Sequence, residues 1–369
     1  MLAKKTCILI VDDVAQNLEI LGSILKDSYS VRIAMNGKKA IEIAQASTDI
    51  EMILMDVMMP DQDGFEVCRK LKENPATRKI PIIFVTSMTD VDDETHGFSI
   101  GGVDYITKPI SPPIVLSRIK THLSLHNQQR LLEKMVQDRT EELLQTRDIT
   151  IFTLASLAEL RDNETGDHIK RTQYYVKAIS KKLAEIFPEF TPFLDEENID
   201  LLYKSAPLHD AGKVGIRDSI LLKPGKLTAE EFTIMKTHTT IGRDAIVRGA
   251  TEMGLEKVSS FLQTARDIAY SHHEKWDGSG YPENLSGESI PLSGRIMALC
   301  DVYDALISKR VYKPPFPHEK AVQIIREGSG THFDPRIVET FMRMEKEFLN
   351  IAFYYTTLAE ERENLKKSL

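Results

Sequence analysis

The 369-residue chain has few cysteines, no long apolar run and no excess of positive charge. Its cysteines, Cys7, Cys68 and Cys300, lie apart in apolar stretches without a CxxC spacing, which indicates reduced, buried thiols in a cytosolic protein. The apolar run behind the N-terminal lysines ends at Asp12, too early for a signal peptide or a membrane-spanning helix. The net charge of −8 argues against direct binding of nucleic acids or anionic membranes, although a local basic cluster could still hold a phosphate ligand.

What is present predicts two globular domains, because the chain is too long for one and contains 42% apolar and 28% charged residues. In residues 1–122, short apolar runs alternate with helical patterns such as NLEILGSILK. The runs are CILIV (7–11), VRIA (31–34), MILM (52–55), IIFV (82–85) and YIT (105–107). This alternation predicts an α/β domain with a doubly wound sheet of five parallel strands.

Polar side chains stand where the expected strands end. They are Asp12 and Asp13, then Asp56, Thr86 and Lys108. Strands of such a sheet place ligands at their carboxyl ends, so these groups should converge on one edge. Each aspartate alone would fit an ordinary turn. Clustered carboxylates repel one another unless a hard cation neutralises them, so their joint placement predicts a Mg²⁺ site.

These stretches resemble the response-regulator receiver domain over residues 5–122, through VDD (11–13), MDVMMPDQDGFE (55–66), VTS (85–87) and DYITKP (104–109). The resemblance implies that Asp56 accepts a phosphoryl group from a sensor histidine kinase. It also implies a Mg²⁺ site of Asp12, Asp13 and Asp56, a switch formed by Thr86, Tyr105 and Lys108, and a cis bond before Pro109. A phosphoryl group adds charge and acceptor oxygens toward which a hydroxyl and an ammonium group can turn.

The connector between the domains, residues 123–150, contains neither proline nor glycine and is dense in charge, which predicts one long helix. The apolar pairs Leu131/Leu132, Met135/Val136 and Leu143/Leu144 form a partial heptad seam that is broken near Arg139. A solvated single helix is one interpretation. The other is a parallel two-stranded coiled coil, since a long polar-faced helix needs a partner to bury its apolar stripe, and such a coil would make the chain a homodimer.

Residues 151–369 show helical periodicity and few strand signals, which predicts an all-α domain. Titratable residues gather in RDNETGDHIKR (161–171), LHDAGKVGI (208–216), MKTHTTIG (235–242), SHHEKWDGSGYP (271–282) and LCDVYDAL (299–306). The histidines in these stretches are His168, His209, His238, His272 and His273, and every one of these stretches also contains a carboxylate or a glycine. The last segment, residues 337–369, carries no recognisable chemistry and could cap the domain or help it dimerise.

Histidine and carboxylate ligands without cysteine suit Fe, Mn, Co, Ni or Zn. His209 offers an imidazole to one metal, and Asp210 a carboxylate that can bridge to a second. Lys213 lies four residues after His209, so on a helix it would face the same way and could contact a substrate phosphate. Asp301 is expected to begin a helical stretch. The plainer alternatives are single hydrogen-bonded histidines, a turn at Glu164 and a helix cap at Asp301.

The same stretches resemble the HD-GYP subfamily of the HD phosphohydrolases over roughly residues 150–345, through ETGDH, HDAGK, His238, HHEKWDGSGYP and DVYDAL. The resemblance implies eight metal ligands: Glu164, His168, His209, Asp210, His238, His272, His273 and Asp301. It also implies catalytic roles for Asp210 and Lys213 and substrate contacts from Lys213, Arg310 and Tyr281. The presence of Glu164 favours three metals over two, with Fe or Mn preferred.

The activity implied by the resemblance is hydrolysis of cyclic di-GMP to linear pGpG and, in some members, to GMP. No serine or cysteine in these stretches is set up as a nucleophile, so a metal-bridging hydroxide would attack phosphorus while cations neutralise the phosphate oxygens. Two alternatives stay open. The GYP surface could instead bind partners such as diguanylate cyclases, or the substrate could be another cyclic dinucleotide.

Overall fold

The computed structural model describes residues 5–60, 62–87, 91–162, 167–252, 254, 259–309 and 314–368. The chain divides into two compact units, Met1–Glu141 and Glu142–Leu369. None of the helices in the described ranges combines the length and the apolar character that crossing a membrane requires.

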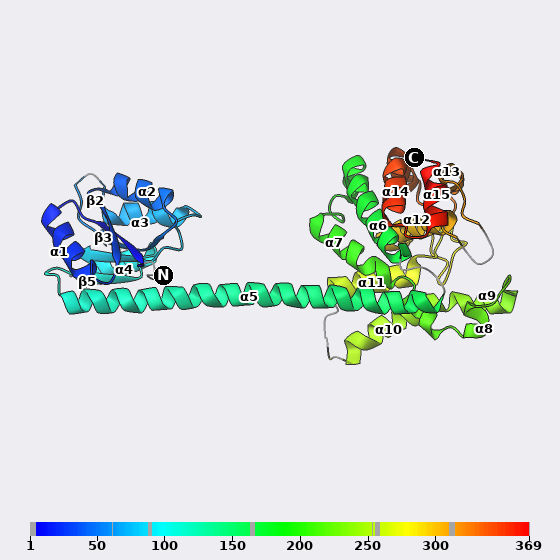
Figure 1. The fold of residues 1–369 in the computed structure, drawn as a ribbon, viewed down its shortest axis with the longest axis horizontal. Helices are drawn as coiled ribbons and strands as arrows, with labels where there is room; N and C mark the ends of the chain where they lie inside the picture. Colours follow the sequence, from blue (N-terminus) through cyan, green and yellow to red (C-terminus); the bar gives the residue numbers. More distant parts are fainter. Residues whose placement is uncertain are drawn as a thin grey trace. The chain divides into compact units, whose positions relative to one another are not determined.

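The first unit is a five-stranded parallel sheet in the order β2-β1-β3-β4-β5, with helices on both faces (Figure 1). Its strands are β1 Cys7–Val11, β2 Ser30–Ala34, β3 Ile50–Asp56, β4 Ile82–Thr86 and β5 Asp104–Thr107. Its helices are α1 Ala15–Leu25, α2 Gly37–Ala46, α3 Gly64–Glu73, α4 Val91–Ser99 and the start of α5. The predicted doubly wound sheet is confirmed, and each expected strand lies inside an observed one.

Burial on both faces explains why the strands read as unbroken apolar runs. In β1, Leu9 packs into the core formed with α2 and α3, while its neighbour Ile10 packs into the core formed with α1 and the start of α5. Both side chains are fully buried. A parallel strand covered on each face by helices has no polar side to show, so its sequence does not alternate.

Helix α5, Pro112–Arg161, is the predicted connector, and it is one unbroken helix. Its first turns belong to the sheet unit, where Arg118 and His122 both bind Asp104 at the start of β5. Its last turns belong to the helical unit, where the Arg147 guanidinium lies 5.2 Å from the centre of the Phe261 ring. Each end of α5 is therefore fixed by side chains of the unit that it joins.

The middle of α5 leaves large apolar side chains exposed. Leu132, Val136 and Leu143 are 58%, 65% and 71% exposed, and these positions follow the spacing of the expected heptad seam. The helix itself confirms the prediction for the connector. Its pairing with a second helix stays a prediction.

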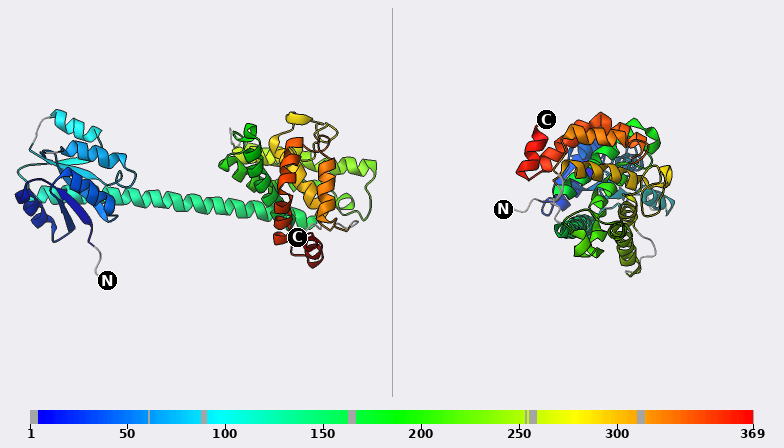
Figure 2. Two further views of the ribbon diagram at one scale, coloured as in Figure 1. Left: turned by 90° about the horizontal axis from the view of Figure 1, so that it is seen from above. Right: turned by 90° about the vertical axis from the view of Figure 1, so that its right-hand side faces the viewer.

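The second unit is helical, as predicted (Figures 1 and 2). Its α-helices are α6 Asp167–Ile186, α7 Glu196–Ser205, α8 Asp218–Leu221, α9 Ala229–Lys236, α10 His238–Glu252, α11 Ser260–Ser271, α12 Leu292–Ile307, α13 His318–Glu327, α14 Pro335–Tyr355 and α15 Ala359–Lys366. Short 3₁₀ turns cover Pro188–Phe190, Ala206–Leu208, Ala211–Gly215 and Gly287–Ser289. The core includes fully buried Tyr175 of α6, Tyr303 of α12 and Phe348 of α14, whose rings stack or meet edge to face.

Candidate metal centre and substrate pocket

Four histidines of the helical unit are held in one orientation by their Nδ1 atoms. They are His168, His209, His238 and His272, and their partners are Asp304 Oδ2, Ala206 O, Met235 O and Ile268 O, at 2.8–2.9 Å. Because these partners accept hydrogen bonds, each Nδ1 carries the proton, and each ring in its neutral form presents a lone pair on Nε2. Fixing the second ring nitrogen in this way is how proteins orient a metal-binding histidine.

The candidate ligand atoms form two adjacent groups. Within each group these atoms lie within 4.8 Å of one another. One group is Asp210, His238, His272 and His273, and the other is His168, His209 and Asp301. Asp210 spans both groups, because its Oδ2 lies 3.3 Å from His209 Nε2 while its Oδ1 lies 3.4 Å from His238 Nε2. A carboxylate in this position suits a bridge between two cations.

In the described part of the chain, three polar atoms at the centre of these groups lack the hydrogen-bond partners that buried polar atoms normally have. Asp210 Oδ1, His238 Nε2 and His272 Nε2 are buried without a hydrogen-bond partner among the described residues. His168 Nε2 and His209 Nε2 lie 3.3 Å apart, in contact with each other. Each unsatisfied atom costs about 1–3 kcal/mol. Divalent cations would satisfy the three atoms that lack a partner within the described ranges, so the residues present fit the expected metals.

The protonation states also suit metal binding. Burial lowers the pKa of His238 to about 4 and holds the pKa of His273 well below its usual value, so both rings are neutral near pH 7. Burial alone would raise the pKa of Asp210, but Lys213 and His209 hold it well below its usual range. Neutral imidazoles and an ionised carboxylate are the ligand forms of these side chains.

Behind His168 lies a buried ion pair. Arg171 donates from Nε and Nη2 to the two oxygens of Asp304, at 2.7 and 2.8 Å, and the same carboxylate accepts from His168 Nδ1. Arg171 and Asp304 are essentially unexposed. Burial would raise the pKa of Asp304, but Arg171 and His168 hold it far below its usual value, so the carboxylate stays ionised. The ion pair fixes the ring of His168 from behind.

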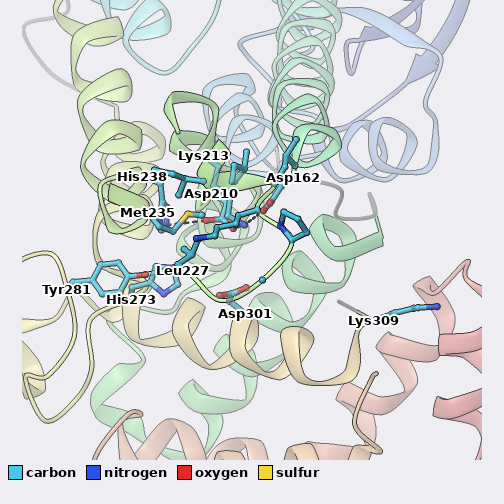
Figure 3. Close-up of a pocket in the computed structure, with 16 residues that line it drawn as sticks. Asp162, Asp210, Lys213, Leu227, Met235, His238, His273, Tyr281, Asp301 and Lys309 are labelled. Atoms are coloured by element: carbon cyan, nitrogen blue, oxygen red, sulfur yellow. Dashed lines mark hydrogen bonds and ion pairs between the residues drawn. The ribbon is translucent and has the colours of Figure 1, made fainter. Parts of the chain in front are cut away.

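A cavity of about 450 Å³ opens beside the candidate ligands (Figure 3). Asp210, His238, His273 and Asp301 line one part of it, and an apolar wall that includes Ile220–Leu222, Leu227 and Met235 lines another. Such a mixed pocket suits a ligand that combines charged groups with flat apolar ones.

Lys213 lies at the charged part of this cavity. Its Nζ is 2.8 Å from Asp210 Oδ2 and 2.5 Å from Asp162 Oδ2. Asp162 comes directly after α5, and the last residue of that helix, Arg161, donates to the carbonyl oxygens of Val214 and Ile216. The end of the connector helix is therefore attached to the loop that carries Lys213.

The HHEKWDGSGYP loop (272–282) returns sharply to the site. Gly280 passes so close to the backbone of the same loop that a Cβ there would lie 2.3 Å from Lys275 N, and Gly278 has a φ of +81°. This path stacks the Tyr281 ring on His273, with centroids 4.8 Å apart. The glycines thus bring Tyr281 to the cavity wall.

The receiver site also assembles at the expected edge. The carboxylates of Asp12, Asp13 and Asp56 offer ligand atoms within 4.8 Å of one another. Lys108 Nζ lies 3.1 Å from Asp12 Oδ2 and 3.0 Å from Asp56 Oδ2, and burial raises the pKa of Asp56.

Two of the expected switch residues lie on the neighbouring strands β4 and β5. Thr86 is the last residue of β4, Tyr105 is the second residue of β5, and both side chains are buried. The Tyr105 hydroxyl occupies the space that the absent side chain of Gly97 leaves. The Lys108–Pro109 bond is cis, as the resemblance implied.

Comparison with known proteins matches each of the two sites to a family. Residues 130–337 match the HD domain family, and residues 8–120 match the response regulator receiver domain. The chain is 47% identical to a probable cyclic di-GMP phosphodiesterase of Vibrio cholerae, over 94% of this chain and 79% of that protein. It is 35% identical to the cyclic di-GMP phosphodiesterase response regulator RpfG of Xanthomonas campestris, over 84% of this chain and 79% of that protein.

This chain belongs to the HD-domain response regulators. The predicted enzyme class, a metal-dependent phosphodiesterase, is confirmed with it. A further relative, a 3'3'-cGAMP-specific phosphodiesterase of Vibrio cholerae, is 40% identical over 57% of this chain and 37% of that protein.

Two local predictions for this HD-domain response regulator are wrong. Asp301 does not begin or cap a helix, because α12 starts at Leu292, directly after Pro291, and Asp301 lies in its second half. Lys213 does not follow His209 on an α-helix, because the chain forms a 3₁₀ turn in which Gly212 touches the backbone of His238. Glu164 and Arg310, an expected ligand and an expected phosphate contact, lie outside the described residues.

Several residues that support the site were not predicted from the sequence. They are Asp162, Arg171, Asp304 and Glu361. Asp162 and Arg171 stand at the two ends of the RDNETGDHIKR stretch, and Asp304 lies in DVYDAL, so their proximity to expected ligands was the available signal. Glu361 gave no signal of this kind.

Proposed function

We propose that this HD-domain response regulator hydrolyses cyclic di-GMP with two or three divalent cations. The observation that carries the proposal is Asp210, whose two oxygens face separate histidine groups beside a 450 Å³ cavity. When bound, the cations supply an activated water as nucleophile and neutralise charge on the phosphate.

The residues of the chain would divide the remaining work. The charged part of the cavity would hold one phosphodiester, with Lys213 moving from Asp162 to a phosphate oxygen and adding charge stabilisation in the transition state. The apolar wall at Ile220–Leu222 would cover a guanine base and exclude water. Arg310 remains a predicted second phosphate contact, and Tyr281 a predicted substrate contact.

Hydrolysis is tested directly on the purified full chain loaded with Mn²⁺ or Fe²⁺ without oxygen. Linear pGpG, separated by chromatography, is the expected product, with GMP as a possible second product. The Asp210→Asn variant should lose activity, whereas Asp200→Asn on the exposed face of α7 should not. Absence of linear product from wild-type protein with measured metal content would overturn the proposal.

The same pocket supports a second substrate candidate, another cyclic dinucleotide, because a 3'3'-cGAMP-specific phosphodiesterase is among the relatives. Both substrates share the phosphodiester that the metals and Lys213 would act on, so only the bases distinguish them. Rates measured side by side on cyclic di-GMP and 3'3'-cGAMP decide between the two. Elemental analysis of protein purified without oxygen tests the preference for Fe or Mn and the number of metals per chain.

We further propose that a histidine kinase phosphorylates Asp56 and that the receiver, residues 1–122, controls the catalytic domain, residues 151–369, through the connector. Two contacts support this route. Asp104, next to Tyr105, binds the start of α5, and Arg161 at its end binds the loop after Lys213. Activity of wild-type protein should change with a phosphodonor, and that of Asp56→Ala should not. An equal response of both proteins would contradict the route.

Dimer formation through α5 is part of this proposal, supported by its exposed apolar side chains such as Leu132 and Leu143. Sedimentation equilibrium should show a dimer that Leu143→Lys weakens. Capture of a diguanylate cyclase through the GYP loop is the competing role. The stacking of Tyr281 on His273 at the cavity favours a substrate contact, and loss of hydrolysis in Tyr281→Ala would support that reading.

A further inference from the structure

The match to the HD domain family ends at residue 337, but the fold continues through the rest of α14 and α15. Helix α15 is short and largely polar, and it packs against α14 (Figure 2). Two of its residues are buried, Glu361 and Leu365. Leu365 joins the apolar core, whereas Glu361, 2% exposed, places a carboxylate inside the protein. A buried carboxylate is costly unless charged or hydrogen-bonding groups meet it.

Two groups meet Glu361, and both belong to the neighbourhood of the candidate metal centre. Its Oε1 accepts a hydrogen bond from the backbone nitrogen of Lys309 at 2.7 Å. Its Oε2 lies 3.7 Å from Nη1 of Arg171. Arg171 in turn holds Asp304, and Asp304 holds Nδ1 of His168.

The first contact fixes the chain where α12 has ended. Lys309 precedes Arg310, the predicted phosphate contact, and it lines the cavity. Its side chain points away from the other labelled residues in Figure 3 and pairs with the exposed Glu360 at 2.6 Å. Its backbone is therefore what Glu361 holds.

The second contact acts on the charge of Arg171. This guanidinium is 1% exposed and already donates to both oxygens of Asp304, so its remaining Nη1 faces Glu361 and Thr356. With carboxylates on two sides, the guanidinium plane is fixed, and Asp304 is kept in line with His168. Groups that orient a metal-binding histidine from behind set its affinity for metal.

We infer that Glu361 is a positioning residue through which α15 orients His168 for metal and holds the Lys309 backbone beside the substrate cavity. This inference rests on the proposed function and extends it to a helix outside the matched family segment. Glu361 touches neither the candidate metals nor the cavity itself, so its influence passes through Arg171 in one direction and through the Lys309 backbone in the other.

Three variants of the full chain separate these two routes. Glu361→Gln retains an oxygen for the Lys309 nitrogen and removes the charge that faces Arg171. Glu361→Ala removes both contacts. Glu360→Gln is the matched control, because Glu360 is the preceding residue, is exposed and, within the described ranges, pairs with the Lys309 side chain and not with its backbone.

The main readout is Mn²⁺ affinity of the metal-free proteins, measured by calorimetric titration without substrate. We expect Glu361→Gln to bind Mn²⁺ about three- to tenfold more weakly, below the 10–100-fold loss typical of a group that touches the ligand itself. Its KM should stay near the wild-type value, whereas Glu361→Ala should raise KM as well. Glu360→Gln should match wild type in both.

Wild-type Mn²⁺ affinity in a folded Glu361→Gln would overturn the inference, even if its melting temperature fell, because α15 would then be only a structural cap. Equal loss of affinity in Glu360→Gln would also overturn it. Failure of the proposed function looks different. In that case wild-type protein binds Mn²⁺ and leaves cyclic di-GMP intact, while the affinity difference between the two glutamate variants persists.

Discussion

Removing divalent cations should destabilise the helical unit far more than the receiver. Asp210 Oδ1, His238 Nε2 and His272 Nε2 are buried without hydrogen-bond partners among the described residues. At about 1–3 kcal/mol each, they represent roughly 3–9 kcal/mol that ligands can recover. Cations at 1,000 times their Kd stabilise the folded state by about 4 kcal/mol, within that range. For a unit the size of Glu142–Leu369, this corresponds to a shift in Tm of roughly 8–16 °C.

Differential scanning calorimetry of the full chain can measure this shift, because two compact units should give two transitions. Metal-free protein is scanned in Mg²⁺ buffer with and without Mn²⁺. Mg²⁺ prefers oxygen ligands and serves the receiver carboxylates in both samples, so the receiver transition acts as an internal reference. Only the transition of the helical unit should move when Mn²⁺ is added.

The Asp210→Asn variant tests the origin of the shift, because it removes the carboxylate that spans both histidine groups. Most of the Mn²⁺ stabilisation should disappear in this variant, whereas Asp200→Asn on α7 should keep all of it. An unmoved helical transition in the wild-type protein would refute the reasoning. So would an equal shift in Asp210→Asn, since the cation would then bind elsewhere.

Three further changes have defined outcomes. Asp304→Asn removes the carboxylate that accepts two hydrogen bonds from buried Arg171 and leaves only the more distant Glu361 to face its charge, so it should cost roughly 3 kcal/mol in denaturant unfolding, unlike an exposed Asp→Asn change. Gly280→Ala places a Cβ 2.3 Å from a backbone nitrogen and should reduce kcat at least tenfold, whereas Gly249→Ala, which meets no atom within 4 Å, should leave kcat unchanged. Burial lowers the pKa of His332 to about 4. Below pH 6.5 the unfolded chain therefore binds a proton that the folded chain does not bind, and the free energy of unfolding decreases as the pH decreases. Between pH 7 and pH 5 this loss is about 2 kcal/mol, and His332→Gln should lack it in urea titrations at both pH values.

The fold could be predicted where a helix or strand is determined by the pattern of apolar residues within its own segment. CILIV and GKKAIEIAQA coincide with β1 and α2, because a strand buried on both faces and an amphipathic helix each leave a plain pattern of apolar residues. The start of α12 was missed because LSGRIMALC is buried on nearly all sides, so its apolar residues show no clear period. The 3₁₀ turn at Lys213 was missed because Gly212 meets α10, a contact between distant segments.

In the candidate site, the expected ligands could be predicted from the sequence, whereas the residues that support them could not. Histidines and aspartates of the expected ligand set stand in short motifs, so the sequence could suggest them, and the structure gathers seven of them around two centres. The residues that hold these ligands have no motif of their own. Arg171, Asp304 and Glu361 come from three helices far apart in the chain, and their role exists only once those helices pack together.

The anchoring of α5 has a consequence for how chains of this kind can be assembled from interchangeable modules. Its last turns are part of the helical unit through three contacts. Arg147 lies over the Phe261 ring, Asp148 forms an ion pair with Lys204, and Arg161 donates a hydrogen bond to the loop after Lys213. A recombination that exchanged the receiver for another sensory module would preserve these contacts only if it joined upstream of Arg147. The exposed middle of α5 is therefore the natural junction for gene fusion, and a chimera cut after Arg147 should express poorly and bind metal weakly.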